Sequence, residues 1–189
     1  THPVIITALV QACRDAGAKR VIVTDCPVRR SRVAFERSGI LAAAQAAGAE
    51  VVIPEESRLV KVVISPRLGV WDVLEPFVQA TKIINVPVAK YHPLIGYSCG
   101  MKNWIGITNL LRMKFHNDLQ SSIAELAALM RPTLTIVDAS RILLSNSPEG
   151  GSLDDVKRLH ALAAGTDPVA LDAWAAEQVG MARDALPAF

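Results

Sequence analysis

Apolar residues recur along the chain with two spacings, one typical of helices and one typical of buried strands. Residues 4–16 follow helical spacing and end at Gly17, a residue favoured just beyond a helix terminus. The continuous apolar run 21–23 follows and predicts a buried strand. The same spacings predict further helices over 31–47, 71–80, 105–112, 119–130 and 168–179, the last with Asp167 as its N-cap. They predict further strands over 51–53, 59–64, 82–88, 134–137 and 159–164.

The alternation of strands and helices predicts an α/β fold of three layers, with a mostly parallel, Rossmann-like sheet and helices on both of its faces. Ligands bind such sheets at the carboxyl ends of the strands. Asp25, the segment 90–103 and Asp138 each follow a predicted strand end, so we expect one cleft to gather them. The alternative is that the two aspartates are only turn residues.

Composition limits the class of protein. The chain has 189 residues, of which 51% are hydrophobic and 20% charged, and this suits one compact domain over residues 1–189. Its formal charge of +2 is too small to favour a nucleic-acid partner. No apolar run in the sequence approaches the ~18 residues that a membrane helix needs. We therefore expect a soluble, cytoplasmic domain.

The cysteines bear on cofactors and on the compartment. Cys13, Cys26 and Cys99 are well separated, form no Cys-x-x-Cys pair and are too few to supply the usual four thiolates of an iron–sulfur cluster. We expect free thiols in a reducing compartment, and no iron–sulfur cluster held by the chain's own cysteines. The chain begins at Thr1 and not at Met, which predicts a processed or truncated piece that has lost its first strand.

One segment, residues 90–103, is polar and rich in glycine where the rest of the chain is apolar. It places His92 and the ammonium groups of Lys90 and Lys102 among small residues, a mixture that favours anionic groups such as carboxylate or phosphate. His92 is the natural proton carrier at neutral pH, and we expect it and Lys102 to be the catalytic residues. The residues expected to contact a small anionic substrate or cofactor are Asp25, Lys90, Gly96, Ser98, Gly100, Asn103 and Asp138.

The same segment admits three other interpretations. Its Gly-x-Ser98-x-Gly motif matches the nucleophile elbow of a serine hydrolase, and Asp138 and His160 follow in the required order, but loop residues separate Ser98 from the preceding strand. The glycines lack the Gly-x-Gly-x-x-Gly spacing of a dinucleotide site. Cys99 as a nucleophile has no orienting group nearby beyond His92.

Short motifs in a fixed order carry a family resemblance. They are the Thr-x-Pro opening, Val-Thr-Asp25, Asn85-x-Pro87-x-x-Lys90-x-His92, Lys102-Asn103-x-x-Gly106, His116-x-Asp118, Arg131-Pro132-x-Leu134-Thr-x-Val137-Asp138 and Thr166-Asp167-Pro168-Val-Ala170-x-Asp172. In these motifs, over nearly its whole length, the chain resembles the uncharacterised family catalogued as domain of unknown function 362. Members of that family often carry a ferredoxin-like domain with iron–sulfur clusters. The resemblance therefore implies an iron–sulfur domain or protein as a partner.

A second and more distant likeness is to the nickel-pincer lactate racemases, in the spacing His92-x-x-x-Gly96-aromatic-Ser98-x-Gly100-x-Lys102. By that likeness His92 moves a proton, Lys102 anchors a cofactor or an anionic substrate, and His116 is the counterpart of a metal-ligating histidine. Two departures limit the transfer of activity. Residues 24–27 hold no second catalytic histidine, and Cys99 replaces a glycine.

Two hypotheses of function follow. The first is an enzyme-like domain that performs acid/base or redox chemistry on a small carboxylate-type substrate, with a metal as a candidate cofactor. In it His92 is the acid/base and Lys102 is the anchor of the anion or cofactor. The second is a non-catalytic ligand-binding or electron-transfer partner module, in which another domain or protein carries the redox centre.

Overall fold

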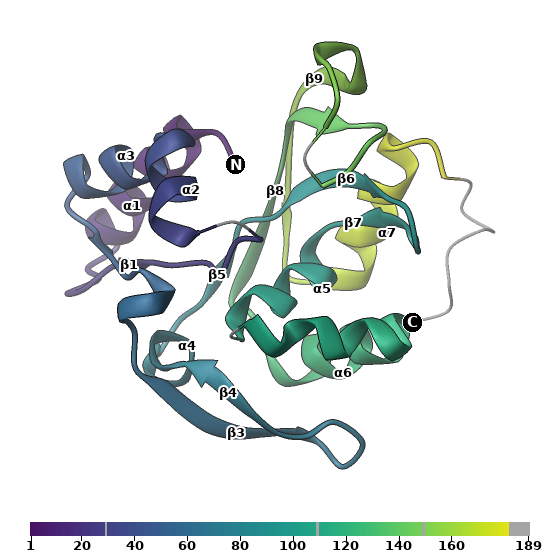
Figure 1. Ribbon diagram of the computed structural model, residues 1–189. Coiled ribbons are helices and arrows are strands. Elements are labelled where there is room, and N and C mark those ends of the chain that lie inside the picture. Colours follow the sequence, from purple (N-terminus) through teal and green to yellow (C-terminus); the bar gives the residue numbers. More distant parts are fainter. Residues whose placement is uncertain (29, 109, 149, 182–189) are drawn as a thin grey trace. The chain divides into compact units, whose positions relative to one another are not determined.

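The computed structural model describes residues 1–28, 30–108, 110–148 and 150–181 (Figure 1). The chain forms two compact units: residues 1–80 with 106–112, and residues 81–105 with the chain from 113 onward. No helix in the described ranges combines the length and the apolar character that crossing a membrane requires. Each unit has strands and helices of its own.

The first unit begins with helices around a short parallel pair of strands. Its elements are α1 (Pro3–Asp15), β1 (Ile22–Val23), α2 (Ser31–Arg37), α3 (Ile40–Ala46), β2 (Glu50–Val51) and the 3₁₀ turn η1 (Pro54–Glu56). β1 and β2 pair in parallel, and Gly17 follows α1 with a φ of 90°, as predicted. The single helix predicted over 31–47 is wrong, because Gly39, with a φ of 75°, separates α2 from α3.

A two-stranded hairpin follows in the first unit. β3 (Leu59–Ser65) and β4 (Gly69–Leu74) pair antiparallel. The helix predicted over 71–80 is wrong in its first half, because antiparallel pairing with β3 places this stretch in β4, and only α4 (Glu75–Gln79) is helical. Pro76 lies in the first turn of α4, where its missing N–H leaves no helical hydrogen bond unmade.

Within the described residues, the sheet of the second unit has five strands. They are β5 (Ile84–Asn85), β6 (Val88–His92), β7 (Gly96–Ser98), β8 (Leu134–Leu143) and β9 (Val156–Gly165). β5 and β6 follow one another along the same edge of β8, both parallel to it, and Pro87, which has no N–H, interrupts them. β7 pairs antiparallel with β6, and β9 pairs antiparallel with β8. The order across the sheet is therefore β7, β5/β6, β8, β9.

The α/β class predicted from the sequence is confirmed, because strands alternate with helices and the middle of the sheet is parallel. β8 and β9 are longer than the strands predicted over 134–137 and 159–164. Their antiparallel pairing extends both of them, since each strand satisfies the backbone groups of the other beyond the apolar runs.

Helical elements follow β7 and β9. They are α5 (Gly100–Asn103), η2 (Trp104–Ile107), η3 (Leu110–Asp118), α6 (Leu119–Leu129), η4 (Leu153–Asp155) and α7 (Pro168–Gln178). α6 and α7 confirm the helices predicted over 119–130 and 168–179, and the Asp167 carboxylate caps α7 by accepting two backbone N–H groups at 2.9 and 3.0 Å. The α-helix predicted over 105–112 is wrong, since η2 and η3 are 3₁₀ turns; Asn109 lies outside the described residues.

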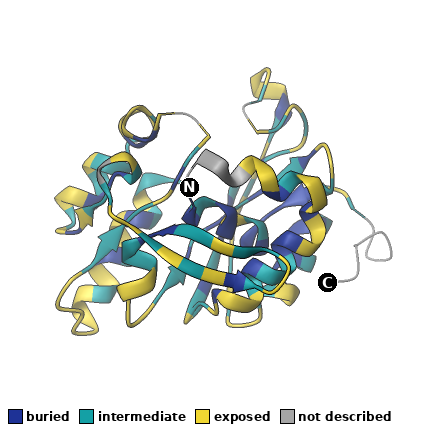
Figure 2. Ribbon diagram, turned by 60° about the horizontal axis from the view of Figure 1, so that its bottom comes forward, coloured by how far each residue is buried: buried dark blue, intermediate teal, exposed yellow. Residues whose placement is uncertain are grey.

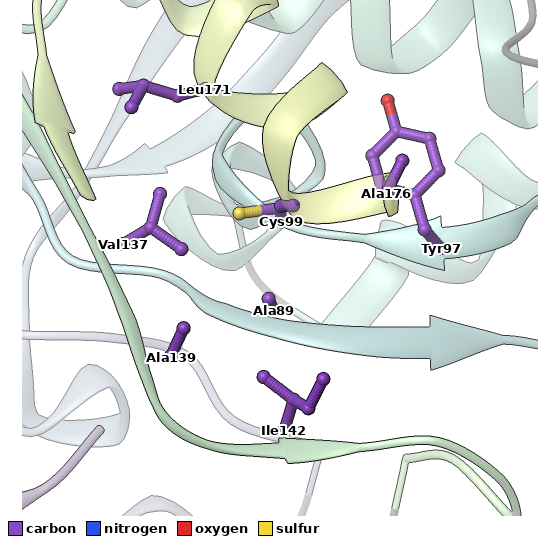
Figure 3. Close-up of a cluster of buried hydrophobic side chains, with 9 residues drawn as sticks. Ala89, Tyr97, Cys99, Val137, Ala139, Ile142, Leu171 and Ala176 are labelled. Atoms are coloured by element: carbon purple, nitrogen blue, oxygen red, sulfur yellow. The ribbon is translucent and has the colours of Figure 1, made fainter. Parts of the chain in front are cut away.

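α7 packs on one face of the sheet and forms the core of the second unit with it. Figure 3 shows this buried cluster, in which side chains of β6, β7 and β8 meet those of α7. Its members are Ala89, Tyr97, Cys99, Val137, Ala139, Ile142, Leu171, Ala175 and Ala176. Buried and exposed positions alternate along the elements, as Figure 2 shows. In each strand, the residues next to those that contact α7 therefore point to the opposite face of the sheet.

Candidate functional site

The β6–β7 hairpin carries most of the candidate residues. Its strands pair Lys90 with Ser98 and His92 with Gly96. A three-residue turn joins them, and Gly96 follows with a φ of 79°, the left-handed conformation that such a turn needs. A Cβ on Gly96 would also lie 2.6 Å from Met181 Sδ. The fold itself therefore requires this glycine, and its contact with a ligand stays a prediction.

Side chains of the hairpin alternate between the two faces of the sheet. Tyr97 and Cys99 belong to the cluster under α7 (Figure 3). Because successive residues of a strand point to opposite faces, Lys90, His92 and Ser98 lie on the other face. We call this side of the sheet, away from α7, the polar face. The structure thus brings three of the predicted site residues to one surface.

His92 is buried and uncharged at neutral pH. Only 9% of its surface is exposed. The backbone N–H of Leu94 donates to Nδ1 at 3.3 Å, so the proton of the neutral ring lies on Nε2, which is a hydrogen-bond donor. Burial, and then the positive charges of Lys102, His116 and Lys90, lower the pKa of His92 from 6.5 to about 4.

The charges that act on His92 are all positive. Lys90 precedes it on β6, Lys102 lies in α5 and His116 lies in η3, and all three side chains are half-buried. Elements that are distant in sequence therefore bring two ammonium groups and a second imidazole to one buried imidazole. Like charges close together repel, and an anion bound among them lowers that repulsion.

A buried polar network holds the beginning of α5. Asn85 Nδ2 donates to the carbonyl oxygen of Gly100 at 2.9 Å, and Asn103 Nδ2 donates to Asn85 Oδ1 at 2.8 Å. The carboxylate of Asp172, which is 2% exposed, accepts the backbone N–H of Met101 at 3.2 Å on each oxygen. Gly100 and Asn103, which were predicted as ligand contacts, thus have structural partners.

Burial shifts the two titratable groups at this point of the chain. It raises the pKa of Asp172 to about 7, although the N–H groups of Met101 and Gly100 and the thiol of Cys99 stabilise the charged carboxylate. Burial and then the Asp172 carboxylate raise the pKa of Cys99. Since Cys99 is 2% exposed and stays protonated, it is unsuited to act as a nucleophile.

Asp138 lies within β8 and not at its end. The strand end predicted there is wrong, because β8 continues well beyond it. Its carboxylate accepts the N–H and the hydroxyl of Ser140, at 2.9 and 2.6 Å, where the pairing of β8 with both neighbours shifts. Asp138 therefore stabilises the irregularity of β8. This is a structural role, similar to the role of a turn residue that was the alternative considered for Asp138. Its side chain points to the polar face, since Val137 and Ala139 belong to the cluster under α7.

Asp25 belongs to the first unit, so the single cleft predicted for it with 90–103 and Asp138 stays a prediction. It is exposed in the loop after β1, where the N–H of Cys26 donates to the carbonyl oxygen of Gly106 at 3.0 Å. A Cβ on Gly106 would lie 2.5 Å from Asp25 Oδ1, so any larger residue there would displace the Asp25 carboxylate. Gly106, the last residue of the motif that begins at Lys102, therefore contacts the Val-Thr-Asp25 motif inside the first unit.

The serine-hydrolase alternative lacks its geometry. Ser98 is a buried residue of β7 at one side of the sheet, and His160 lies on β9 at the other side. With β6 and β8 between them, about 14 Å of sheet separates β7 from β9. His160 is exposed and has a φ of 51°, where the register of β9 shifts against β8. The two side chains are too far apart to form a catalytic pair.

The structure offers no ligand set for a metal among the residues that it describes. Within those ranges no group of three His, Cys, Asp or Glu side chains is placed to hold a metal ion. A metal as a candidate cofactor, and the organometallic cofactor that the racemase likeness implies, therefore stay predictions. The role of His116 as a metal ligand stays a prediction, and no step proposed below passes through a metal.

The sequence interpretation missed two site-forming residues, Asn85 and Asp172. Both occur in the family motifs, but neither was predicted to have a role in the site. A signal was available, because each is a polar residue within an apolar stretch of its strand or helix. A buried polar group needs partners, so such residues indicate a fixed hydrogen-bond network.

Comparison with known proteins agrees with the motif resemblance. The profile of a family described as Domain of unknown function (DUF362) matches residues 1–177, a range that reaches into both compact units. Searches of curated proteins and of solved structures found no match. The likeness to lactate racemases thus stays a prediction. The chain belongs to the family described as Domain of unknown function (DUF362).

Proposed function

We propose that the second unit binds a small anionic substrate or cofactor beside its polar face. In this proposal Lys102 and Lys90 supply positive charge, and His92 Nε2 supplies a hydrogen bond. The observation that carries it is the buried imidazole, whose pKa is lowered by burial and then by the positive charge of Lys102, with smaller contributions from His116 and Lys90. A carboxylate or phosphate group brings both the negative charge and the acceptor oxygens that match this arrangement.

A bound anion changes what His92 does chemically. Without a ligand, burial and the neighbouring positive charges favour the neutral ring. The negative charge of a ligand favours the protonated ring and raises the pKa of His92 back toward its ordinary value. His92 then exchanges a proton with the ligand, a contribution worth roughly 10²- to 10⁴-fold in rate. The proposed activity is therefore acid/base chemistry on a small carboxylate-type substrate.

Other predicted residues have secondary places in this proposal. Ser98 shares the polar face with His92, and Asn103 is fixed by the hydrogen bond to Asn85 while its own oxygen is left as an acceptor. Gly100 gives its N–H to Asp172, so its contribution to a ligand is close packing only. An iron–sulfur domain or protein is proposed as a partner on the family resemblance alone.

The same geometry supports a second function, a ligand-binding or electron-transfer partner module without catalysis. The observation in its favour is the pKa of His92 at about 4, which suits a hydrogen-bond donor better than a proton carrier. The variant His92→Asn separates the two functions. In an enzyme its turnover collapses while ligand affinity persists, whereas in a binding module only the affinity changes.

Titration calorimetry of the full chain with sulfate and with oxalate, near neutral pH and at low ionic strength, tests the binding proposal. The variant Lys102→Met removes one cation, and we expect it to bind about tenfold more weakly or worse, the value of one hydrogen bond to a charged group. Lys157→Met, which changes an exposed lysine of β9, is the matched control and should bind like the wild type. Equal affinity in all three proteins, or no binding by the wild type, would contradict the proposal.

A further inference from the structure

Asp172 joins α7 to the beginning of α5. Both of its carboxylate oxygens accept the N–H of Met101 at 3.2 Å, and the N–H of Gly100 and the thiol of Cys99 also donate to it. These three residues immediately precede Lys102 in the chain. A single buried side chain therefore fixes the backbone from which Lys102 extends.

Side chains pack closely against this backbone at Gly100. A Cβ on Gly100 would lie 2.9 Å from Asp172 Oδ1, 3.4 Å from Thr135 Cγ2 and 3.5 Å from Asn85 Nδ2. Asn85 also holds the carbonyl oxygen of Gly100, at 2.9 Å. The Gly100–Met101 peptide is thus held from both sides, its N–H by Asp172 and its carbonyl by Asn85.

Holding a helix terminus with a buried carboxylate costs free energy of folding. Burying an ionisable group is unfavourable even when it is hydrogen-bonded, and an apolar side chain in the same place would stabilise the fold as well or better. The carboxylate offers something that an apolar side chain does not, since it accepts several N–H groups in a fixed geometry. Its presence on an otherwise apolar face of α7 therefore indicates a role in positioning.

We propose that Asp172 is the positioning residue of the anion site: its ionised carboxylate fixes the turn at residues 99–101 and thereby holds Lys102 near His92. This inference rests on the proposed function, because it assigns a task to Lys102 in that site. It goes further in naming a residue on a different helix, one that touches no ligand, as the residue on which the site's charge arrangement depends.

The ionisation state of Asp172 matters to this role. A carboxylate only accepts hydrogen bonds and so matches its donors, whereas a carboxylic acid brings an O–H donor against them. The titratable groups that face Asp172 are Tyr97 of β7 and Cys99, which follows β7, and the charge of Asp172 contributes to the raised pKa of each. The other residues packed around Gly100, on β5 and β8, do not titrate. The site is therefore best ordered above neutral pH.

The variant Asp172→Asn tests the inference through the pKa of His92, measured by NMR titration of its ring in the full chain without added ligand. Lys102 is the largest of the charges that lower this pKa. If the substitution releases Lys102, the pKa of His92 rises. Loss of a negative charge acting directly would lower it instead, so the sign of the shift separates positioning from simple charge removal.

Asp167→Asn is the matched control, since it changes an aspartate of the same helix that caps α7 and contributes nothing to α5. We expect the pKa of His92 to rise in Asp172→Asn and to stay unchanged in Asp167→Asn, with sulfate affinity about tenfold lower in the first variant only. An unchanged or lowered pKa of His92 in folded Asp172→Asn would overturn the inference. Failure of the wild type to bind sulfate would instead overturn the proposed function, because the pKa measurement needs no ligand.

A second measurement applies if Asp172→Asn does not fold. This measurement uses the variant His116→Gln, which removes the other imidazole that acts on His92. In this variant the amide resonances of Gly100 and Met101 should titrate with a midpoint near 7, following Asp172. The ring resonances of His92 should show an inflection at the same midpoint, because Lys102 moves with the turn. Amides that titrate near 7 while the His92 ring shows no inflection there would overturn the inference.

Discussion

The two faces of the β6–β7 hairpin use neighbouring residues of one segment for different purposes. On the face under α7, Tyr97 and Cys99 are buried among apolar side chains and their ionised forms are disfavoured. On the polar face, one residue away along the strands, His92 is also buried, and the positive charges of Lys102 and Lys90 act on it. The segment 90–103 is therefore not one functional site, although it holds many reactive side chains. The two-residue period of the strand divides it into a structural half and a candidate functional half.

The sharpest way to test this division is to remove apolar volume from each side of the sheet. Ile142 is 1% exposed in the cluster under α7, so Ile142→Ala should lower the free energy of unfolding by about 2–5 kcal/mol. Leu162, on β9, is 57% exposed, and Leu162→Ala should change it by less than about 0.5 kcal/mol. Urea denaturation measures both. Similar losses in the two variants would show that the burial assigned to the faces is wrong.

Gly100→Ala probes the junction between the two halves. Its Cβ would meet Asp172 Oδ1 at 2.9 Å, and neither Asp172 nor Thr135 is free to withdraw within the packed core. We expect a loss of about 1–3 kcal/mol in the free energy of unfolding, the usual effect of overpacking. The control is Ala164→Gly, which also changes one methyl group, at an exposed position of β9 where no side chain packs closely. Gly180→Ala is unsuited as a control, because Gly180 has a φ of 90°. A Gly100→Ala variant as stable as the wild type would contradict the packing described for α5.

The pH dependence of stability should carry opposite contributions from the two faces. Folded His92 titrates at about 4 and unfolded His92 at 6.5, so the unfolded chain binds the proton more strongly and the His92 contribution falls as pH drops from 6.5 to 4. Folded Asp172 titrates at about 7 and unfolded Asp172 at 3.8, so its contribution falls as pH rises through that range.

Each contribution is at most about 1.4 kcal/mol per pH unit. Denaturation of the wild type, His92→Gln and Asp172→Asn between these pH values separates the two. The advantage of the wild type over His92→Gln should shrink toward acid pH, and its advantage over Asp172→Asn should shrink toward neutral pH. The same trend in both comparisons would contradict the opposite shifts of the two groups.

The smallest expected effect is a shift in the pKa of His92 when one cation is removed. Lys102→Met should raise this pKa, because Lys102 is the largest of the positive charges that act on it. The value should stay below 6.5, because burial is the larger cause and persists in the variant. NMR titration measures the shift, with Lys157→Met as the control. No shift in Lys102→Met would place Lys102 outside the site.

Sequence patterns predicted the elements in which apolar residues recur regularly over many positions. They failed where pairing with a distant strand decides whether a stretch forms a helix or a strand, and how long it is. α1, α6 and α7 follow their predictions because amphipathic spacing and caps such as Asp167 act locally. β4 was predicted as a helix because its pairing with β3 depends on residues elsewhere in the chain. The length of β8 depends in the same way on β9.

The candidate site divides in the same way. His92, Lys90 and Lys102 stand out in sequence because histidine and lysine are rare in an apolar chain and occur there among glycines. The pKa of His92 could not be predicted, since it depends on burial and on charges from β6, α5 and η3 together. The role of Asp172 could not be predicted either, because α7 reaches α5 only through the fold.

Long-range proton–nitrogen NMR of the His92 ring, recorded as pH is varied with and without sulfate, tests whether an anion binds beside a buried neutral imidazole. The structure predicts a neutral ring protonated on Nε2 at neutral pH and a pKa of about 4 in the free protein. It predicts that saturating sulfate raises this pKa, because the bound anion offsets the positive charges that act on the ring. A free ring that titrates at its ordinary value near 6.5, or a pKa that sulfate does not move, would contradict the account of an anion site built around a buried neutral imidazole.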